Sequence, residues 1–378
     1  MKILIAPDKF RNALDAQDVG EALAAGARQA CPSAEIIVCP MADGGEGTGR
    51  LLAEAAAAQQ RTSRVRDPLG RERDARWWWD QQTAAAIIEM AEASGLNLLT
   101  GAERDATRTT SYGTGQLIRA AIDAGARNVT LCVGGSATVD GGAGCLQALG
   151  WELIDQTGEC IRELAAGGTL ERIGEIRPPE PIPRLSSEVL CDVNNPLLGP
   201  RGAAAIFGPQ KGASPTQVRQ LEAGMKNWAA VLTACTGHEV SDLPGAGAAG
   251  GLPAGLAAAL TAKLVPGFDE VARRLELRAK LAGCDLCLTG EGRLDEQTVG
   301  GKVVSGVAEL GRQVGVPVVA LVGDVRPPSG QTVAQLARTV GLREIVVVTP
   351  PNTPTKAALA AAADNLCTAV RRFLRRGD

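Results

Sequence analysis

Four short segments of this sequence combine glycine with an acidic side chain, and each follows a run of residues that favours a β-strand. They are Ala42–Thr48 (ADGGEGT), Gly134–Gly144 (GGSATVDGGAG), Cys191–Pro196 (CDVNNP) and Gly290–Asp295 (GEGRLD). In an open α/β sheet, ligand-binding loops follow the carboxyl ends of the strands. Glycine lets backbone N–H groups approach an anion closely, and a helix that begins next adds the positive end of its dipole. The pattern therefore predicts an α/β fold whose glycine-rich turns suit a phosphorylated ligand.

Short β-rich runs alternate with helical patterns at both ends of the chain. We expect strands over 2–6, 35–39, 285–289, 316–322 and 344–348, and helices over 13–30, 49–58, 303–314 and 356–374. This alternation favours a parallel sheet with helices on both faces. At about 150 residues per domain, the 378 residues favour two domains. We therefore predict one doubly wound domain from residues 1–62 and 284–378.

The middle of the chain has a different texture, and we expect it to form a second, mixed α/β domain, residues 63–283, inserted into the first. Here the sequence predicts a hairpin of 73–79 with 84–90, strands over 129–133 and 188–191, and helices over 114–124 and 216–235. Trp77, Trp78 and Trp79 would send two rings to one face of their strand and one to the other, for packing or for a subunit contact.

Composition excludes several classes of function. The net charge is −3, and only 5 Trp, 1 Tyr and 4 Phe are present, which argues against a nucleic-acid surface. His238 is the only histidine, so mechanisms that need two imidazoles are excluded. No segment approaches the about 20 apolar residues of a membrane span, and the ten cysteines show no short-spaced disulfide framework. We therefore expect a reduced, cytoplasmic protein without membrane or nucleic-acid partners.

Carboxylates beside glycine-rich turns indicate magnesium and phosphoryl transfer. Mg²⁺ prefers oxygen ligands and commonly bridges one or two carboxylates to nucleotide phosphates. An aspartate is also the natural acceptor of a hydroxyl proton in such transfers. Cationic side chains complete the set: Lys9, Arg11, Lys211, Arg293 and Lys302.

Two nucleotide-binding motifs bear on the class of ligand. The P-loop pattern G-x-x-x-x-G-K-[ST] does not occur. The segment Gly245–Gly250 matches G-x-G-x-x-G, and Asp269 follows about twenty residues later, as in dinucleotide-binding folds. Because Ser241–Pro244 does not resemble the strand that must precede this motif, a nicotinamide-dependent oxidoreductase remains only an alternative.

The chain resembles the glycerate kinase family of bacterial glycerate catabolism, whose members act as glycerate 2-kinases. The matching segments run through nearly the whole chain in family order: Ile5–Phe10, Pro40–Thr48, Ile88–Leu96, Thr110–Gly115, Gly134–Gly144, Cys191–Pro196, Phe207–Gly212, Pro244–Gly251 and Thr289–Asp295. The sequence departs from the family pattern at Lys9 and Arg11, where many relatives carry Ser and Lys, after Lys302, and over 325–355.

The resemblance implies ATP-dependent phosphorylation of D-glycerate to 2-phosphoglycerate, with ATP and Mg²⁺ as cofactors. It also implies a flavodoxin-like domain built from both termini, with an inserted α/β domain. A non-catalytic metabolite sensor on the same fold is a second alternative, and the protein would be a monomer or a homodimer.

For the substrate side, we expect glycerate in the cleft between the domains. Its carboxylate would meet Lys9 or Arg11 and the backbone N–H groups of Gly44 and Gly45, with Asn195 as a further substrate contact. Asp192 is the candidate base for the attacking hydroxyl, and Asp43 is the second candidate.

For the nucleotide side, the loop after the strand at 129–133 would hold the ATP phosphates. Its candidate contacts are Gly134, Gly135, Ser136, Thr138, Asp140, Gly141 and Gly142. Glu291 and Asp295 would hold Mg²⁺, and Lys302 or Lys211 would offset charge on the transferred phosphoryl group.

Overall fold

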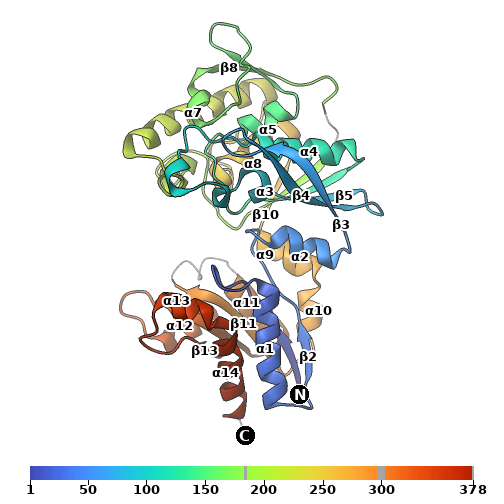
Figure 1. Ribbon diagram of the computed structural model, residues 1–378, viewed down its shortest axis with the longest axis vertical. Helices are drawn as coiled ribbons and strands as arrows, with labels where there is room; N and C mark the ends of the chain where they lie inside the picture. Colours follow the sequence, from blue (N-terminus) through green and yellow to red (C-terminus); the bar gives the residue numbers. More distant parts are fainter. Residues whose placement is uncertain (183–184, 296–302, 377–378) are drawn as a thin grey trace. The chain divides into compact units, whose positions relative to one another are not determined.

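The computed structural model describes residues 1–182, 185–295 and 303–376. The chain packs into two compact units (Figure 1). One unit contains both ends of the chain, Met1–Asp43 and Phe268–Asp378, and the other is Gly44–Gly267. These limits describe packing, and the domain boundaries at 62/63 and 283/284 stay a prediction about independent folding.

The unit that contains both chain ends is built on a five-stranded, fully parallel sheet in the order β13-β12-β11-β1-β2. Its strands are β1 (Lys2–Ile5), β2 (Glu35–Val38), β11 (Leu286–Leu294), β12 (Val318–Val325) and β13 (Glu344–Val347). Short apolar runs suit such a sheet because its strands are covered on both faces. Strands from the two ends of the sequence pair directly, with Ile3 opposite Leu286.

Helices cover both faces of this sheet. The helices of this unit are α1 (Ala16–Ala30), α9 (Gly267–Arg274), α10 (Leu277–Leu281), α11 (Val303–Val314), α12 (Val333–Val340), α13 (Thr355–Ala360) and α14 (Ala362–Arg375). Of these, α1, α11, α12 and α14 pack against its strands. Helices α1 and α14 lie side by side on one face (Figure 1), and a methyl group on Gly26 would fall 2.3 Å from the carbonyl oxygen of Cys367. Helix α11 packs on the other face, where Gly311 lies against Val318.

The inserted unit has a six-stranded mixed sheet in the order β10-β9-β6-β5-β4-β3, beside a two-stranded sheet β7-β8. Its strands are β3 (Gln59–Arg66), β4 (Glu72–Asp80), β5 (Ala85–Glu89), β6 (Asn128–Cys132), β7 (Glu152–Asp155), β8 (Ile173–Arg177), β9 (Ser186–Leu190) and β10 (Lys263–Val265). β5, β6, β9 and β10 are parallel, and β3 and β4 continue the sheet antiparallel.

The helices of the inserted unit pack around this sheet. They are α2 (Thr48–Ala55), α3 (Ala91–Ser94), α4 (Tyr112–Asp123), α5 (Ala143–Ala148), α6 (Ala203–Phe207), α7 (Pro215–Thr236) and α8 (Leu252–Leu260). Helix α7 begins at a capping box of Ser214 with Gln217 and ends at Gly237, which has φ 74°. Within the part of the chain that the structure describes, every helix is too short or too polar to cross a lipid bilayer.

The three consecutive tryptophans are all buried within the chain. Trp77 and Trp79 share one face of β4 and pack edge to face, with ring centroids 6.5 Å apart. Trp78 points to the other face, as the alternation of a strand requires. The predicted hairpin is confirmed by the pairing of Trp78 with Ile87.

The α/β class, the parallel sheet made from both chain ends and the inserted mixed sheet are confirmed. Two local predictions are wrong. The predicted final helix is divided at Ala361 into α13 and α14. The segment Gly290–Asp295, expected to be a loop, continues β11 to Leu294 because Arg293 and Leu294 pair with Asp324 and Val325 of β12.

Candidate active site

The carboxyl ends of four adjacent parallel strands form one edge of the sheet in the inserted unit. Their last residues are in register: Glu89 of β5 lies opposite Cys132 of β6, Cys132 opposite Leu190 of β9, and Leu190 opposite Val265 of β10. Ligands of open α/β sheets bind just beyond such ends. The turns at Gly134, Asp192 and Gly267 all begin within two residues of this row.

The glycine turn at Gly44–Gly45 packs directly against two of these turns. Gly44 has φ 84°, and a methyl group there would lie 2.9 Å from the carbonyl oxygen of Leu190. A methyl group on Gly134 would lie 2.4 Å from Cα of Gly45, and the Gly134 N–H donates to the carbonyl of Gly44 at 3.3 Å. Three of the four segments singled out in the sequence therefore meet in one place.

Only the beginning of the loop Gly134–Gly144 reaches solvent. Gly135 is exposed and Gly134 is half-buried, whereas Ser136, Thr138 and Asp140–Gly142 are buried. The carboxylate of Asp140 accepts hydrogen bonds from N–H and Oγ of Ser111, both at 2.7 Å, and from the N–H groups of Gly142 and Gly144 at 3.3 and 3.4 Å. Burial raises the pKa of Asp140, and these donors oppose the rise. The buried carboxylate of Asp140 thus stabilises the conformation of the loop.

Lys211 supports the same loop from the other side. Its side chain is enclosed, with 2% of the residue exposed, and Nζ donates to Ser136 Oγ at 2.7 Å and to the carbonyl of Thr138 at 2.8 Å. The ammonium also lies 5.9 Å from the centre of the Phe207 ring. Burial lowers the pKa of Lys211 to about 7, although the charge of Asp140 opposes this.

A pH-dependent stability follows from the buried ammonium of Lys211. Below pH 7 the side chain is protonated in both the folded and the unfolded protein; above it, the folded protein releases the proton while the unfolded chain keeps it to near the ordinary value of 10.5. Since the unfolded state binds more protons in this window, the free energy of unfolding should rise with pH by up to about 1.4 kcal/mol per pH unit. Lys211→Met should lack this contribution. Guanidinium unfolding of both proteins from pH 7 to pH 10 measures the difference, and parallel pH profiles would contradict the burial of the charge.

Asp192 and Asn195 follow β9 and are held by neighbouring loops. Oδ1 of Asp192 accepts the N–H of Gly267, the first residue of α9, at 2.5 Å. Nδ2 of Asn195 donates to the backbone carbonyl of Arg201 at 2.7 Å. The backbone carbonyl of Asn195 accepts from the N–H of Gly247 at 3.0 Å.

The segment Gly245–Gly250 packs against these loops. No strand of the described chain precedes it after α7, which agrees with the sequence argument against a dinucleotide fingerprint. A methyl group on Gly250 would lie 1.8 Å from the carbonyl oxygen of Thr138, and one on Gly247 would lie 2.1 Å from that of Pro196. These two glycines therefore let the segment Gly245–Gly250 pack closely against the loops that contain Thr138 and Pro196.

The other unit carries the remaining predicted residues, at the carboxyl ends of β1, β2 and β11. Oδ1 of Asp8 accepts the N–H of Lys9 at 2.7 Å, and the Asp8 N–H donates to the carbonyl of Gly290 at 2.8 Å. Burial, and after it the charge of Asp43, raise the pKa of Asp8 to about 7, while Lys9 and Arg11 act in the opposite direction. Asp8, Asp43, Lys9 and Arg11 thus form one cluster of charges.

Glu291 is buried near the end of β11, and Asp295 directly follows the strand. Four positions of extended chain separate their backbones by about 13 Å. Among residues 1–182, 185–295 and 303–376, no three His, Cys, Asp or Glu side chains gather around a possible ion. Both residues supply the carboxylate oxygens that Mg²⁺ prefers, and this ion commonly uses only one or two of them. Lys302 lies outside the described residues.

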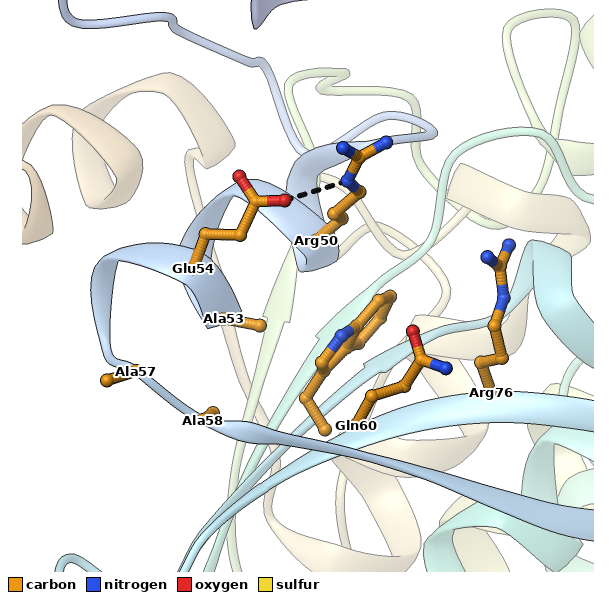
Figure 2. A pocket seen from close by; sticks show the side chains of 8 residues that line it. Arg50, Ala53, Glu54, Ala57, Ala58, Gln60 and Arg76 are labelled. Carbon is orange, nitrogen blue, oxygen red and sulfur yellow. Dashed lines mark hydrogen bonds and ion pairs between the residues drawn. The ribbon is translucent and has the colours of Figure 1, made fainter.

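A separate hollow of about 520 Å³ opens between α2 and strands β3 and β4 (Figure 2). Arg50, Glu54, Gln60, Arg76 and Trp78 are among its lining residues, and none of the predicted site residues lines it. Arg50 is paired with Glu54 at 2.8 Å, and Arg76 is paired with Glu92 at 2.5 Å. These pairs offset the positive charge of the hollow.

The sequence prediction missed two acidic residues that contact these loops or belong to them, Glu89 and Asp8. Glu89 is buried at the end of β5, and its carboxylate binds the first turn of α2. Both residues lie at the end of a predicted strand, inside segments that carry the family resemblance. An acidic residue at the carboxyl end of an apolar strand is the signal that could have found them.

Comparison with known proteins shows the family of this chain. The model of the glycerate kinase family matches residues 3–377. Glycerate 2-kinase of Escherichia coli strain K12 is 40% identical over 376 residues, 99% of this chain and 97% of that protein. A glycerate kinase of Halalkalibacterium halodurans is 42% identical over 326 residues, 85% of each chain.

A solved structure is similar to this chain along its whole length. It is the crystal structure of a protein from Salmonella typhimurium LT2, provisionally named glycerate kinase 2, with 39% identity and a TM-score of 0.84 over 100% of this chain and 98% of that one. With a family model across almost every residue and relatives of about 40% identity along the full length, the chain belongs to the glycerate kinase family.

Proposed function

We propose that this protein is a glycerate kinase that transfers the γ-phosphoryl group of ATP to D-glycerate and forms 2-phosphoglycerate. Family membership supports the reaction class. The observation that carries the proposal is the contact of the Gly44–Gly45 turn with Gly134 and with Leu190, two residues before Asp192. Backbone N–H donors and a carboxylate are brought to one edge of a sheet, as phosphoryl transfer by positioning and electrostatics requires.

On the nucleotide side, the exposed part of the loop would bind the phosphates. Gly135 is exposed, so its backbone N–H is the candidate donor to a phosphate. The N–H of Gly134 donates to the carbonyl of Gly44 at 3.3 Å, so Gly134 would shape the turn. The buried side chains of Ser136, Thr138, Asp140 and Lys211 would act through the loop, because their hydrogen bonds are made to it or within it. Gly141 and Gly142 would allow the turn to close, since both have positive φ.

On the substrate side, the Gly44 and Gly45 amides would bind the carboxylate of glycerate, and Lys9 or Arg11 would supply its cationic partner. Asp192 would accept the proton of the attacking hydroxyl. Its Oδ1 is engaged by Gly267 N–H, which fixes the carboxylate and favours Oδ2 as the basic atom. Asp43 remains the second candidate, now as a neighbour of Asp8.

Magnesium would be held at the end of β11. Glu291 is the candidate ligand, and Asp295 would act through the water shell that Mg²⁺ usually keeps. When bound, the ion neutralises phosphate charge that develops during transfer. Lys302, outside the described residues, stays a candidate for offsetting charge on the transferred phosphoryl group.

The sheet of the unit that contains both chain ends supports a flavodoxin-like fold for that unit. Counted within the unit, its strand order is 2-1-3-4-5 with every strand parallel, which is the order of flavodoxin-like folds. In that order the ligand loops lie beside β1 and the third strand, here β11. Asp8 follows the first of these strands and Glu291 lies near the end of the second.

One assay separates the proposed activity from its alternatives. ADP release is measured with ATP and Mg²⁺, with and without D-glycerate, and ³¹P NMR identifies the product. We expect glycerate-dependent ADP release and a phosphorus signal coupled to the C2 proton. A signal coupled to C3 protons would indicate 3-phosphoglycerate, and no release would favour a metabolite sensor. Saturable binding of NADH by fluorescence would instead support an oxidoreductase.

A further inference from the structure

Helix α2 begins without a cap of its own. The residue before it is Gly47, with φ 92° and no side chain to accept a hydrogen bond, and its first turn holds no acidic residue. The first N–H groups of a helix need an acceptor, because they have no partner inside the helix. Here the acceptor comes from another element, about forty residues further along the chain.

That acceptor is the carboxylate of Glu89, the last residue of β5. Oε1 accepts the N–H of Gly49 at 2.7 Å and of Arg50 at 3.2 Å, and Oε2 accepts the N–H of Gly47 at 3.2 Å. Glu89 is only 5% exposed. Burial raises its pKa, and the three N–H groups oppose that rise. One side chain therefore accepts from three backbone donors at the start of α2. The intervening N–H, that of Thr48, donates to the carbonyl of Gly45 at 3.1 Å.

The fit of this carboxylate is tight on the helix side. A methyl group on Gly49 would lie 2.6 Å from Cγ of Glu89. Gly49 therefore leaves the room that the glutamate side chain occupies, and the two residues depend on each other.

The residues bound by Glu89 directly continue the turn that carries Gly44 and Gly45. That turn ends at Gly47, and Gly134 rests on Gly45. Glu89 lies in the same row as the strand ends that precede Gly134 and Asp192. A carboxylate fixed to the rigid sheet thus sets the position of backbone amides in the neighbouring turn.

We propose that Glu89 is a positioning residue for the substrate: it anchors the Gly44–Gly49 turn to β5 and so holds the Gly44 and Gly45 amides where they bind the carboxylate of glycerate. The proposal rests on the proposed function. Since the amides would bind the substrate carboxylate in the ground state and in the transition state alike, loosening them raises KM more than it lowers kcat. The ATP loop has its own supports in Lys211 and Asp140, so KM for ATP should change less.

The test compares substitutions of Glu89 by steady-state kinetics with D-glycerate and ATP varied in turn. Glu89→Ala should raise KM for D-glycerate about tenfold or more, with kcat within about threefold of the parent. Glu89→Gln should give an intermediate value, because the amide oxygen can still accept from Gly49 and Arg50 while its NH₂ group faces the N–H of Gly47. Glu54→Gln is the matched control: Glu54 is an exposed residue of the same helix, paired with Arg50 (Figure 2), and the variant should keep the parental KM.

A double substitution keeps the test valid if Glu89→Ala folds poorly. Gly49→Ala alone should raise KM for D-glycerate, because the new methyl group displaces the carboxylate. In the double variant, the methyl group of Gly49→Ala occupies the space that the Glu89 side chain has left. It should therefore raise KM for D-glycerate no further than Glu89→Ala alone, so that the two effects are not additive. Unchanged KM for D-glycerate in Glu89→Ala and Gly49→Ala, with only a lower melting temperature, would overturn the proposal. Absence of glycerate-dependent ADP release in the parent protein would instead refute the proposed function itself.

Discussion

Asp192→Asn is expected to lower kcat by about 10²- to 10⁴-fold, the usual contribution of a general base, with small changes in KM for both substrates. Asparagine has nearly the same shape, and its Oδ1 can still accept the N–H of Gly267, which now lies at 2.5 Å. The amide nitrogen then takes the place of Oδ2 and cannot accept a proton from the substrate hydroxyl. The loop geometry is kept while the base is removed. Steady-state release of ADP at saturating ATP and D-glycerate measures the effect.

Asp269→Asn is the control for this variant. Asp269 is an exposed carboxylate in the first turn of α9, two residues after the Gly267 that donates to Asp192, so the control removes one charge close to the same helix end. Its kcat should match that of the parent. A loss of less than about tenfold in Asp192→Asn, or about 1.4 kcal/mol in the barrier, would mean that another group takes the proton. Asp43→Asn would then be the next variant to measure.

The sequence predicts which loops follow the carboxyl ends of strands, because that signal is local. Glycine and aspartate after a β-rich run mark the end of a strand, and the ends of parallel strands share one edge of the sheet. Gly134 and Asp192 could therefore be placed just after strand ends. That their strands are neighbours follows only from the structure, in which Cys132 pairs with Leu190.

Interactions between distant segments could not be predicted in the same way. The turn of α2 shows no capping residue, and its acceptor, Glu89, is separated from Gly47 by 42 positions. β11 continues through Gly290–Asp295 because β12 offers it pairing partners, including an ion pair of Arg293 with Asp324 at 3.1 Å. Glycine there would by itself favour a turn, so tertiary pairing overrides local preference.

The sequence also does not show in which direction a side chain points. Asp140 lies in a glycine-rich loop, as a ligand-binding aspartate would, yet its carboxylate accepts hydrogen bonds from Ser111 and from N–H groups of its own loop. Lys211 is expected from the sequence to offset charge on the transferred phosphoryl group, and its ammonium donates to Ser136 Oγ and to the carbonyl of Thr138. Whether such a charge faces a ligand or supports a loop depends on packing.

The contact between the two glycine turns predicts a large effect at Gly134. A methyl group there would fall 2.4 Å from Cα of Gly45, 3.0 Å from its carbonyl carbon and 3.1 Å from the nitrogen of Glu46, all of them backbone atoms. Carbon atoms in contact normally lie about 3.5–4.0 Å apart. Gly134→Ala must therefore push the turns apart by about 1 Å, a misplacement that can cost about 10²-fold in rate. We expect kcat/KM for both substrates to fall by that factor.

Two alanine substitutions separate this geometric effect from a loss of stability. Gly101→Ala has no atom within 4 Å of the new methyl group, and Gly26→Ala meets the carbonyl oxygen of Cys367 at 2.3 Å, where α1 packs on α14. The first should change neither activity nor melting temperature, and the second should lower only the melting temperature, because overpacking typically costs about 1–3 kcal/mol. Gly134→Ala should lower both. If it lowers the melting temperature but keeps the parental kcat/KM, the two turns pack together without sharing the substrates, and the convergence on which the proposed active site rests has no catalytic meaning.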